Sequence, residues 1–379
     1  MRVFKKAILP LGFEANAVAS GIKRSNKLDL GLIYSKENAI AVCMFTSNRI
    51  QAAPIKVNQK YLKKNKIYRA IIVNSGNANC FTGKAGLRDA EETTRYVGTA
   101  LGIRRENVLV ASTGIIGRKL PLKKIKKAIP GLVMGLSDRG IDKVANAIMT
   151  TDTRPKAITV KLNIGGCVVT ICGIAKGSGM IAPDMRTMLG FIFTDAKITK
   201  GALDKALRIS VSNSFNCITV DNCMSTNDMV SILANSLAAN TLIDEARYFK
   251  PFLKALNIVC LELSKMIILD AEGATKFIRI KVDKAASYKE AKKAALAIAN
   301  SNLFKTAIYG ESPNFFGRVI AAIGSSGIDI NEEKLKVKAS PLNKKQINID
   351  VSCGTGMASA TVYTTDLTHQ YIKINTEYN

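Results

Sequence analysis

Apolar and polar positions alternate along the chain in two periods, and these periods predict strands and helices in mixed order. Apolar runs bounded by turn residues predict strands, and apolar residues at helical spacing predict amphipathic helices. The predicted strands cover 30–34, 39–46, 70–73, 107–111, 188–193 and 277–282, with a hairpin over 157–174 and a strand-rich end to 375; the predicted helices cover 86–101, 200–215, 229–239, 243–265 and 289–299. No low-complexity linker separates them, so the pattern predicts a layered α/β or α+β fold.

One stretch, Lys176–Asp195, joins a glycine-rich turn, Pro183 and Thr187 directly to an apolar run. Gly177 and Gly179 permit backbone conformations that other residues avoid, so the turn can hold Thr187 in one pose. From the pattern alone, however, an ordinary loop that leads into a strand is the favoured interpretation.

A second stretch, Ser112-Thr113-Gly114, ends a predicted buried strand. Backbone N–H groups at a glycine-permitted turn are one way to build an oxyanion pocket. The pattern alone favours a plain strand-to-loop turn here as well.

The counts of histidine and cysteine exclude several kinds of catalytic site. The eight cysteines form no C-x-x-C pair, and a single histidine, His369, lies near the end of the chain. Buried thiols in a reducing compartment are therefore expected, without a disulfide framework or a metal site. An enzyme of this composition needs a nucleophile that is activated by a carboxylate, a lysine or a terminal amine.

The net charge of +26 raises the question of nucleic-acid binding. The lysines are spread along the chain without interleaved aromatic residues, so solvated surface charge is favoured over a nucleic-acid site. The positive field should instead attract small anionic substrates. We expect no long apolar span and no leader peptide, hence a cytoplasmic protein that binds neither membrane nor nucleic acid.

Taken together, several segments resemble the glutamate N-acetyltransferase (ornithine acetyltransferase) family of arginine biosynthesis, in the same order and nearly from end to end. The matching segments are Asn48–Pro54, Val73–Asn79, Ala111–Gly117, Met149–Thr153, Lys176–Pro183, Ser225–Asp228 and Glu272–Lys276.

The resemblance implies a precursor with an N-terminal-nucleophile-like fold that cuts itself between Arg186 and Thr187. The products would be an α chain of residues 1–186 and a β chain of residues 187–379 that begins with the nucleophile. Arg186 stands where the family has a small alanine. An α-amino group has a reference pKa of about 7.7–8.0, so its neutral form can accept the threonine hydroxyl proton.

The resemblance also implies the reaction and the role of each site residue. The acetyl group of N-acetylornithine would pass to Thr187 and then to glutamate, and acetyl-CoA is a further candidate donor for N-acetylglutamate synthesis. Thr113 and Gly114 would form the oxyanion hole. The substrate would be held by Thr153, Lys176, Thr187, Glu272 and Asn375. No cofactor or metal is expected, and a heterotetramer of two α and two β chains is implied.

Two other functions remain open. The first is a self-cleaving aminopeptidase of related fold, in which water replaces the amine acceptor. The second is a basic binding protein that has lost catalysis, which the net charge of +26 suggests.

Overall fold

The structure is a computed structural model that describes residues 1–182 and 188–377. It divides into two compact units. The first consists of Met1–Gly177, Asp184–Ser214 and Met224–Leu263, and the second of Ser178–Pro183, Phe215–Cys223 and Ser264–Asn379.

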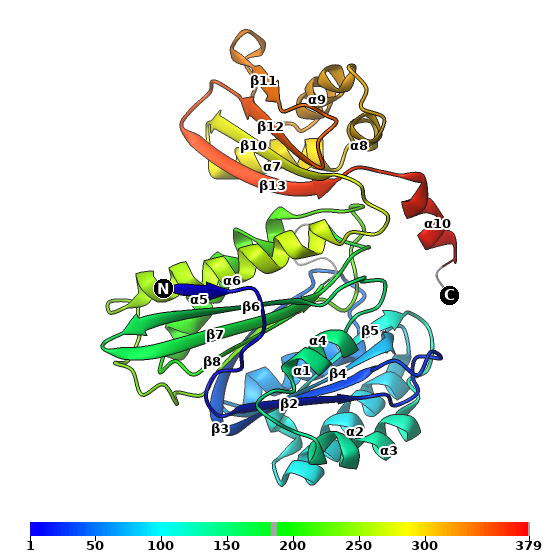
Figure 1. The fold of residues 1–379 in the computed structure, drawn as a ribbon, viewed down its shortest axis with the longest axis vertical. Coiled ribbons are helices and arrows are strands. Elements are labelled where there is room, and N and C mark those ends of the chain that lie inside the picture. The colour runs from blue at the N-terminus through cyan, green and yellow to red at the C-terminus, as the bar shows by residue number, and fades with distance from the viewer. Residues whose placement is uncertain (183–187, 378–379) are drawn as a thin grey trace. The chain divides into compact units, whose positions relative to one another are not determined.

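The first unit is built on a nine-stranded sheet with the strand order β1-β6-β7-β8-β9-β3-β4-β5, in which β2 also pairs with β3. Its strands are β1 (Arg2–Phe4), β2 (Phe13–Val18), β3 (Leu30–Phe45), β4 (Tyr68–Asn77), β5 (Val108–Ile115), β6 (Lys156–Ile164), β7 (Cys167–Lys176), β8 (Leu189–Thr194) and β9 (Met229–Ala234). Its helical segments are α1 (Ala53–Lys64), α2 (Gly83–Leu101), η1 (Arg105–Asn107), α3 (Leu122–Met134), α4 (Ile141–Ala147), α5 (Lys200–Ser212) and most of α6 (Phe249–Leu269). Figure 1 shows α5 and α6 running alongside one another.

Both faces of this sheet are buried, because alternate residues of its strands enter two different cores. Ile71 and Val73 of β4 belong to one cluster, and Ala70 and Ile72 belong to the other. Gly173 of β7 leaves the space that side chains of α6 fill, since a Cβ there would lie 2.7 Å from Val259. Helices therefore cover a sheet whose central strands read as nearly continuous apolar runs.

Strand β8 lies in the middle of the sheet. It pairs antiparallel with β7, where Lys176 is opposite Leu189, and parallel with β9, where Leu189 is opposite Met229. Strand β9 in turn pairs antiparallel with β3. The first residues of β8 therefore lie beside the carboxyl end of β7.

The second unit contains a four-stranded sheet in the order β11-β12-β10-β13. Its strands are β10 (Phe277–Ala285), β11 (Lys336–Ala339), β12 (Gln346–Ser352) and β13 (Ala358–Thr365), and its helical segments are η2 (Phe215–Cys217), α7 (Tyr288–Ala299), α8 (Asn302–Tyr309), α9 (Phe315–Gly324), η3 (Glu332–Lys334) and α10 (His369–Glu377). Ser287 and Ser301 cap α7 and α8 by accepting hydrogen bonds from backbone N–H groups. Apolar residues of the sheet and of α7, α8 and α9 form the core of this unit.

The layered α/β class predicted from the sequence is confirmed, but some predicted elements are wrong. The two strands predicted over 30–34 and 39–46 are one strand, β3. The helix predicted over 229–239 is strand β9, every residue of which is buried between two neighbouring strands. Periodicity in a short apolar run does not distinguish a buried strand from a helix. The strand-rich end predicted to reach Asn375 stops at β13, and Asn375 lies in helix α10.

The predicted fragments 1–186 and 187–379 stay a prediction, and they do not coincide with the compact units. Each unit takes residues from both sides of that boundary. Among the described residues, no helix is long and apolar enough to cross a membrane.

Candidate active site

Lys176 lies at the carboxyl end of β7, and its ammonium group is surrounded by polar side chains of the first unit. Its Nζ donates to the hydroxyl of Thr150 at 2.8 Å and lies 3.5 Å from that of Thr113. The side chain is only 7% exposed, and the Asp152 carboxylate is 3.9 Å away. The structure therefore brings together the predicted substrate-binding Lys176 and the predicted oxyanion-hole residue Thr113.

Asp152 is buried behind Lys176 and is the acceptor for several neighbours. Its Oδ1 accepts from Lys156 Nζ at 2.6 Å and from the Gly177 N–H at 2.7 Å, and its Oδ2 accepts from the Thr150 N–H at 3.0 Å. Burial alone would raise the pKa of Asp152, but the positive charges of Lys176 and Lys156 and these hydrogen bonds lower that pKa to about 2. Asp152 is therefore an anion throughout the physiological pH range.

Gly114 follows Thr113 near the carboxyl end of β5, where only glycine fits. Its φ is 131°, and a Cβ on it would lie 2.4 Å from the carbonyl carbon of Gly76 in β4. The parallel pairing with β4 is irregular here, because Thr113 is opposite both Ser75 and Asn77. This irregularity interrupts the regular ladder of β4 and β5 beside Thr113 and Gly114.

Lys23 supports the segment that carries Thr150 and Asp152. Its Nζ donates to the carbonyl oxygens of Met149 at 2.8 Å and Ala147 at 3.3 Å. Burial and the nearby charge of Lys176, opposed by the attraction of Asp29, lower the pKa of Lys23 to about 8. The predicted substrate-binding residue Thr153 follows this segment and is exposed.

The start of β8 is held by the buried carboxyl group of Asp228. Its Oδ1 accepts from the Met188 N–H at 2.8 Å, and the Met188 carbonyl accepts from the Met229 N–H. Burial raises the pKa of Asp228 well above its ordinary range, despite the hydrogen bond from Met188. Thr187 and the predicted cleavage site after Arg186 lie outside the described residues.

Two further predicted residues, Glu272 and Asn375, meet in the second unit. The Asn375 side chain donates from Nδ2 to the Glu272 carboxylate at 2.8 Å, and the Glu272 N–H donates to the Ser178 carbonyl at 3.0 Å. Gly179 leaves space for that carboxylate, because a Cβ on it would lie 2.1 Å from Glu272 Oε2. The second glycine of the motif is thus required by the position of Glu272.

Asp221 organises the same motif from the second unit. Its carboxylate accepts from the Met180 N–H at 2.6 Å, from the Ile181 N–H at 2.9 Å and from the Tyr371 hydroxyl at 3.0 Å. These bonds connect the motif to helix α10, which carries Asn375. The sequence analysis gave no role to Asp152, Asp221 or Asp228. Their position inside or beside a motif segment is the feature of the sequence that could have identified these carboxylates.

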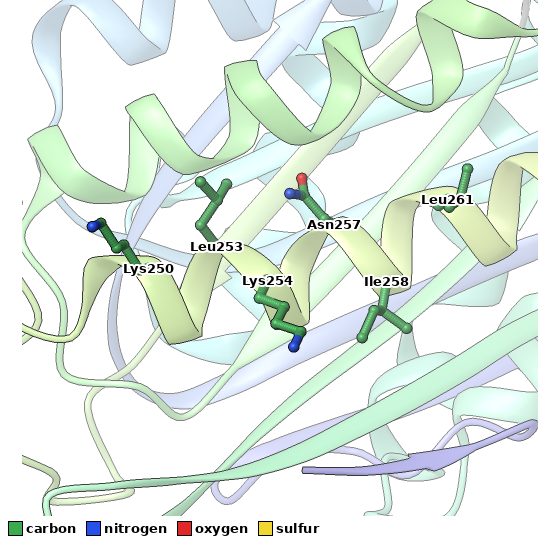
Figure 2. A pocket seen from close by; sticks show the side chains of 6 residues that line it. All are labelled: Lys250, Leu253, Lys254, Asn257, Ile258 and Leu261. Atoms are coloured by element: carbon green, nitrogen blue, oxygen red, sulfur yellow. The ribbon is translucent and has the colours of Figure 1, made fainter. Parts of the chain in front are cut away.

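Two hollows lined by described residues of the first unit contain none of the predicted site residues. One, with a volume of about 300 Å³, is lined by Lys250, Leu253, Lys254, Asn257, Ile258 and Leu261. Figure 2 shows that all of these side chains project from α6. No group of three or more potential metal ligands occurs among the described residues.

We expect Gly179→Ala to weaken substrate binding, because its new methyl group displaces the Glu272 carboxylate. For N-acetylornithine, the substrate that the family resemblance implies, KM should rise about tenfold, equivalent to about 1.4 kcal/mol, with kcat changed less. Steady-state kinetics measure the effect. Gly317→Ala is the matched control in the same unit, since nothing lies within 4 Å of its new Cβ. An unchanged KM for Gly179→Ala would contradict the assignment of Glu272 to the substrate.

Comparison with known proteins identifies the family. The family model described as ArgJ family matches residues 14–379. The chain belongs to the ArgJ family. The arginine biosynthesis bifunctional protein ArgJ of Caldanaerobacter subterraneus subsp. tengcongensis is 44% identical over 398 residues, with 98% of each chain covered. That of Geobacter sulfurreducens is 42% identical, with 97% of this chain and 98% of the relative covered.

Among solved structures, ornithine acetyltransferase of Mycobacterium tuberculosis, in complex with ornithine, aligns with a TM-score of 0.44 and 36% identity. The alignment covers 49% of this chain and 98% of that chain. The family predicted from the motif segments is confirmed, and with it an acyltransferase function in arginine biosynthesis.

Proposed function

We propose that this ArgJ family member transfers the acetyl group of N-acetylornithine to glutamate through an acetyl ester on Thr187. Family membership supports the reaction, and the site of Lys176 supports the substrate. A largely buried cation lies 3.5 Å from the hydroxyl of Thr113, the predicted oxyanion-hole residue. Because a buried ammonium group binds an anion strongly, a substrate carboxylate on Lys176 would bring the acetyl group near that hole.

The reaction has two matching halves. The Thr187 hydroxyl oxygen attacks the acetyl carbonyl carbon while the neutral α-amino group of Thr187 takes the hydroxyl proton. Thr113 and Gly114 stabilise the resulting oxyanion. The bond from the acetyl carbon to the ornithine nitrogen then breaks, and that nitrogen takes the proton as ornithine leaves. Glutamate's amine attacks the acetyl ester in the reverse sense, which releases N-acetylglutamate and restores Thr187.

The remaining roles follow from charge. Glu272, oriented by Asn375 at 2.8 Å, pairs with the substrate ammonium group, and Thr153 contributes a hydroxyl to the same substrate. Acetyl-CoA is a second donor for the same acetyl-Thr187 step, and no cofactor takes part. We place the processed enzyme in the cytoplasm as a heterotetramer of two α and two β chains.

The proposed reaction is tested with purified protein, N-acetylornithine and glutamate. Formation of N-acetylglutamate and ornithine in equal amounts supports transfer. Release of free acetate without N-acetylglutamate would instead favour the hydrolytic alternative, in which water is the acceptor. Absence of both products would leave the basic binding protein as the better interpretation.

We expect self-cleavage on expression, because the motif from Lys176 to Thr187 resembles that of self-processing precursors. Intact-mass measurement should find two fragments, residues 1–186 and 187–379. Arg186→Ala should speed the cleavage, since the family that the chain resembles has a small alanine before the nucleophile. An uncleaved chain that still transfers acetyl groups would contradict the proposed role of the Thr187 α-amino group as the base.

A further inference from the structure

The carboxylate of Asp152 contacts two lysines unequally. Lys156 Nζ lies 2.6 Å from Oδ1, which is a full ion pair with both side chains at most 1% exposed. Lys176 Nζ lies 3.9 Å from Oδ2, which is beyond hydrogen-bond distance. Lys156 therefore makes the direct ion pair with the buried carboxylate, whereas the Lys176 ammonium group lies farther from it.

Asp152 is nevertheless connected to Lys176 through the backbone and through Thr150. The Gly177 N–H, in the peptide that follows Lys176, donates to Oδ1 at 2.7 Å. The Thr150 N–H donates to Oδ2 at 3.0 Å, and the Thr150 hydroxyl accepts from Lys176 Nζ at 2.8 Å. These contacts fix both the start and the end of the Lys176 side chain.

A buried carboxylate needs a compensating cation, because an unpaired charge in a poorly hydrated site is costly. Lys156 supplies that cation at 2.6 Å. Asp152 can therefore stay charged and accept the hydrogen bonds from the Thr150 and Gly177 N–H groups.

We propose that Asp152 and Lys156 form a positioning pair for Lys176: Asp152 fixes the peptide that follows Lys176 and the Thr150 residue that accepts from its ammonium group, and Lys156 compensates the buried charge of Asp152. This inference rests on the proposed function, which assigns the substrate carboxylate to Lys176. A buried ion pair is weak evidence for stability, because a neutral pair of similar volume often replaces it without loss. A positioning role for Asp152 has a different consequence, because its loss should reduce the preference for a substrate with a carboxylate over one without.

The test compares N-acetylornithine with its carboxamide, which has the same shape but no negative charge. The preference is the ratio of kcat/KM for the acid to kcat/KM for the amide. The parent should prefer the acid, and Lys176→Met should lose that preference. Asp152→Asn should also lower the preference, by roughly 100-fold. The new NH₂ group would face the N–H group of either Thr150 or Gly177, two donors that cannot bond to each other, and the resulting shift would displace Lys176.

Two further variants distinguish a loss of substrate preference from a failure to fold. Asp152→Asn combined with Lys156→Met replaces the ion pair by a neutral pair, so it should fold even where the single variant does not, and its preference should still fall. Asp195→Asn is the matched control: Asp195 is a buried carboxyl group that accepts from the Thr170 N–H at 2.8 Å and the Leu11 N–H at 3.2 Å. It should retain the parent preference.

A second measurement asks whether Asp152 acts through Lys176. In the Lys176→Met background, Asp152→Asn should cause no further loss of preference, since neighbours that work as one unit are not additive. Independent, additive losses would overturn the inference, as would a folded Asp152→Asn protein with the parent preference. If the parent itself transfers no acetyl group or shows no preference for the acid, the proposed function fails instead.

Discussion

Thr187→Ala is expected to abolish both self-cleavage and acetyl transfer, because no hydroxyl remains to attack either the preceding carbonyl or the acetyl group. The purified variant should have the intact mass of residues 1–379. Incubation with N-acetylornithine, followed by denaturing mass spectrometry, should find no acetylated protein. Transfer activity should fall by a factor of about 10⁶ or more, which is the usual effect of removing a catalytic nucleophile.

Thr187→Ser is the matched control, since serine retains the hydroxyl and loses only a methyl group. It should still be cleaved and should still carry an acetyl group on the fragment that begins at residue 187. An acetylated fragment from Thr187→Ala would contradict the assignment of the nucleophile.

Glu272→Gln is expected to leave self-cleavage intact and to weaken the use of N-acetylornithine. Cleavage needs no bound substrate amine, whereas the substrate ammonium group loses its charged partner. Glu272 is half-buried, so the lower end of the range for a charge pair applies, about 2 kcal/mol or roughly thirtyfold in kcat/KM. Steady-state kinetics with the pre-cleaved enzyme measure the loss.

The control for Glu272→Gln is a substitution at its partner. Asn375→Ala removes the hydrogen bond of 2.8 Å to the Glu272 carboxylate but keeps the negative charge, so its loss should be smaller than that of Glu272→Gln. Kinetics of Glu272→Gln that match the parent, or a protein that is no longer cleaved, would contradict the role proposed for Glu272.

The sequence predicted the family and most elements because both depend on local patterns. The motif segments predicted Thr113, Lys176 and Glu272 as site residues, and these roles stay predictions. The buried strand that begins near Leu189 was recognised from its apolar run. The strand over Met229–Ala234 was missed for a physical reason. Its apolar residues are buried on both faces, so the alternation that distinguishes a strand from a helix is absent.

The supporting carboxylates could not be predicted from the sequence, because their partners are distant along the chain. Asp228 meets the Met188 N–H only after β8 and β9 pair, and Asp221 meets Tyr371 across 150 positions. The unequal distances from Asp152 to Lys156 and Lys176 are likewise a matter of tertiary geometry. Residue types and their order do not contain that information.

The place of β8 and β9 in the sheet has a consequence for the predicted cleavage before Thr187. Both strands belong to residues 187–379, yet they are enclosed by β7 on one side and β3 on the other, which belong to residues 1–186. A cut before Thr187 therefore changes the covalent connectivity without freeing either piece, since separation would break two rows of backbone hydrogen bonds at once. The two polypeptides should copurify in one-to-one ratio until a denaturant is added, and pieces synthesised separately should reach the native state only by folding together.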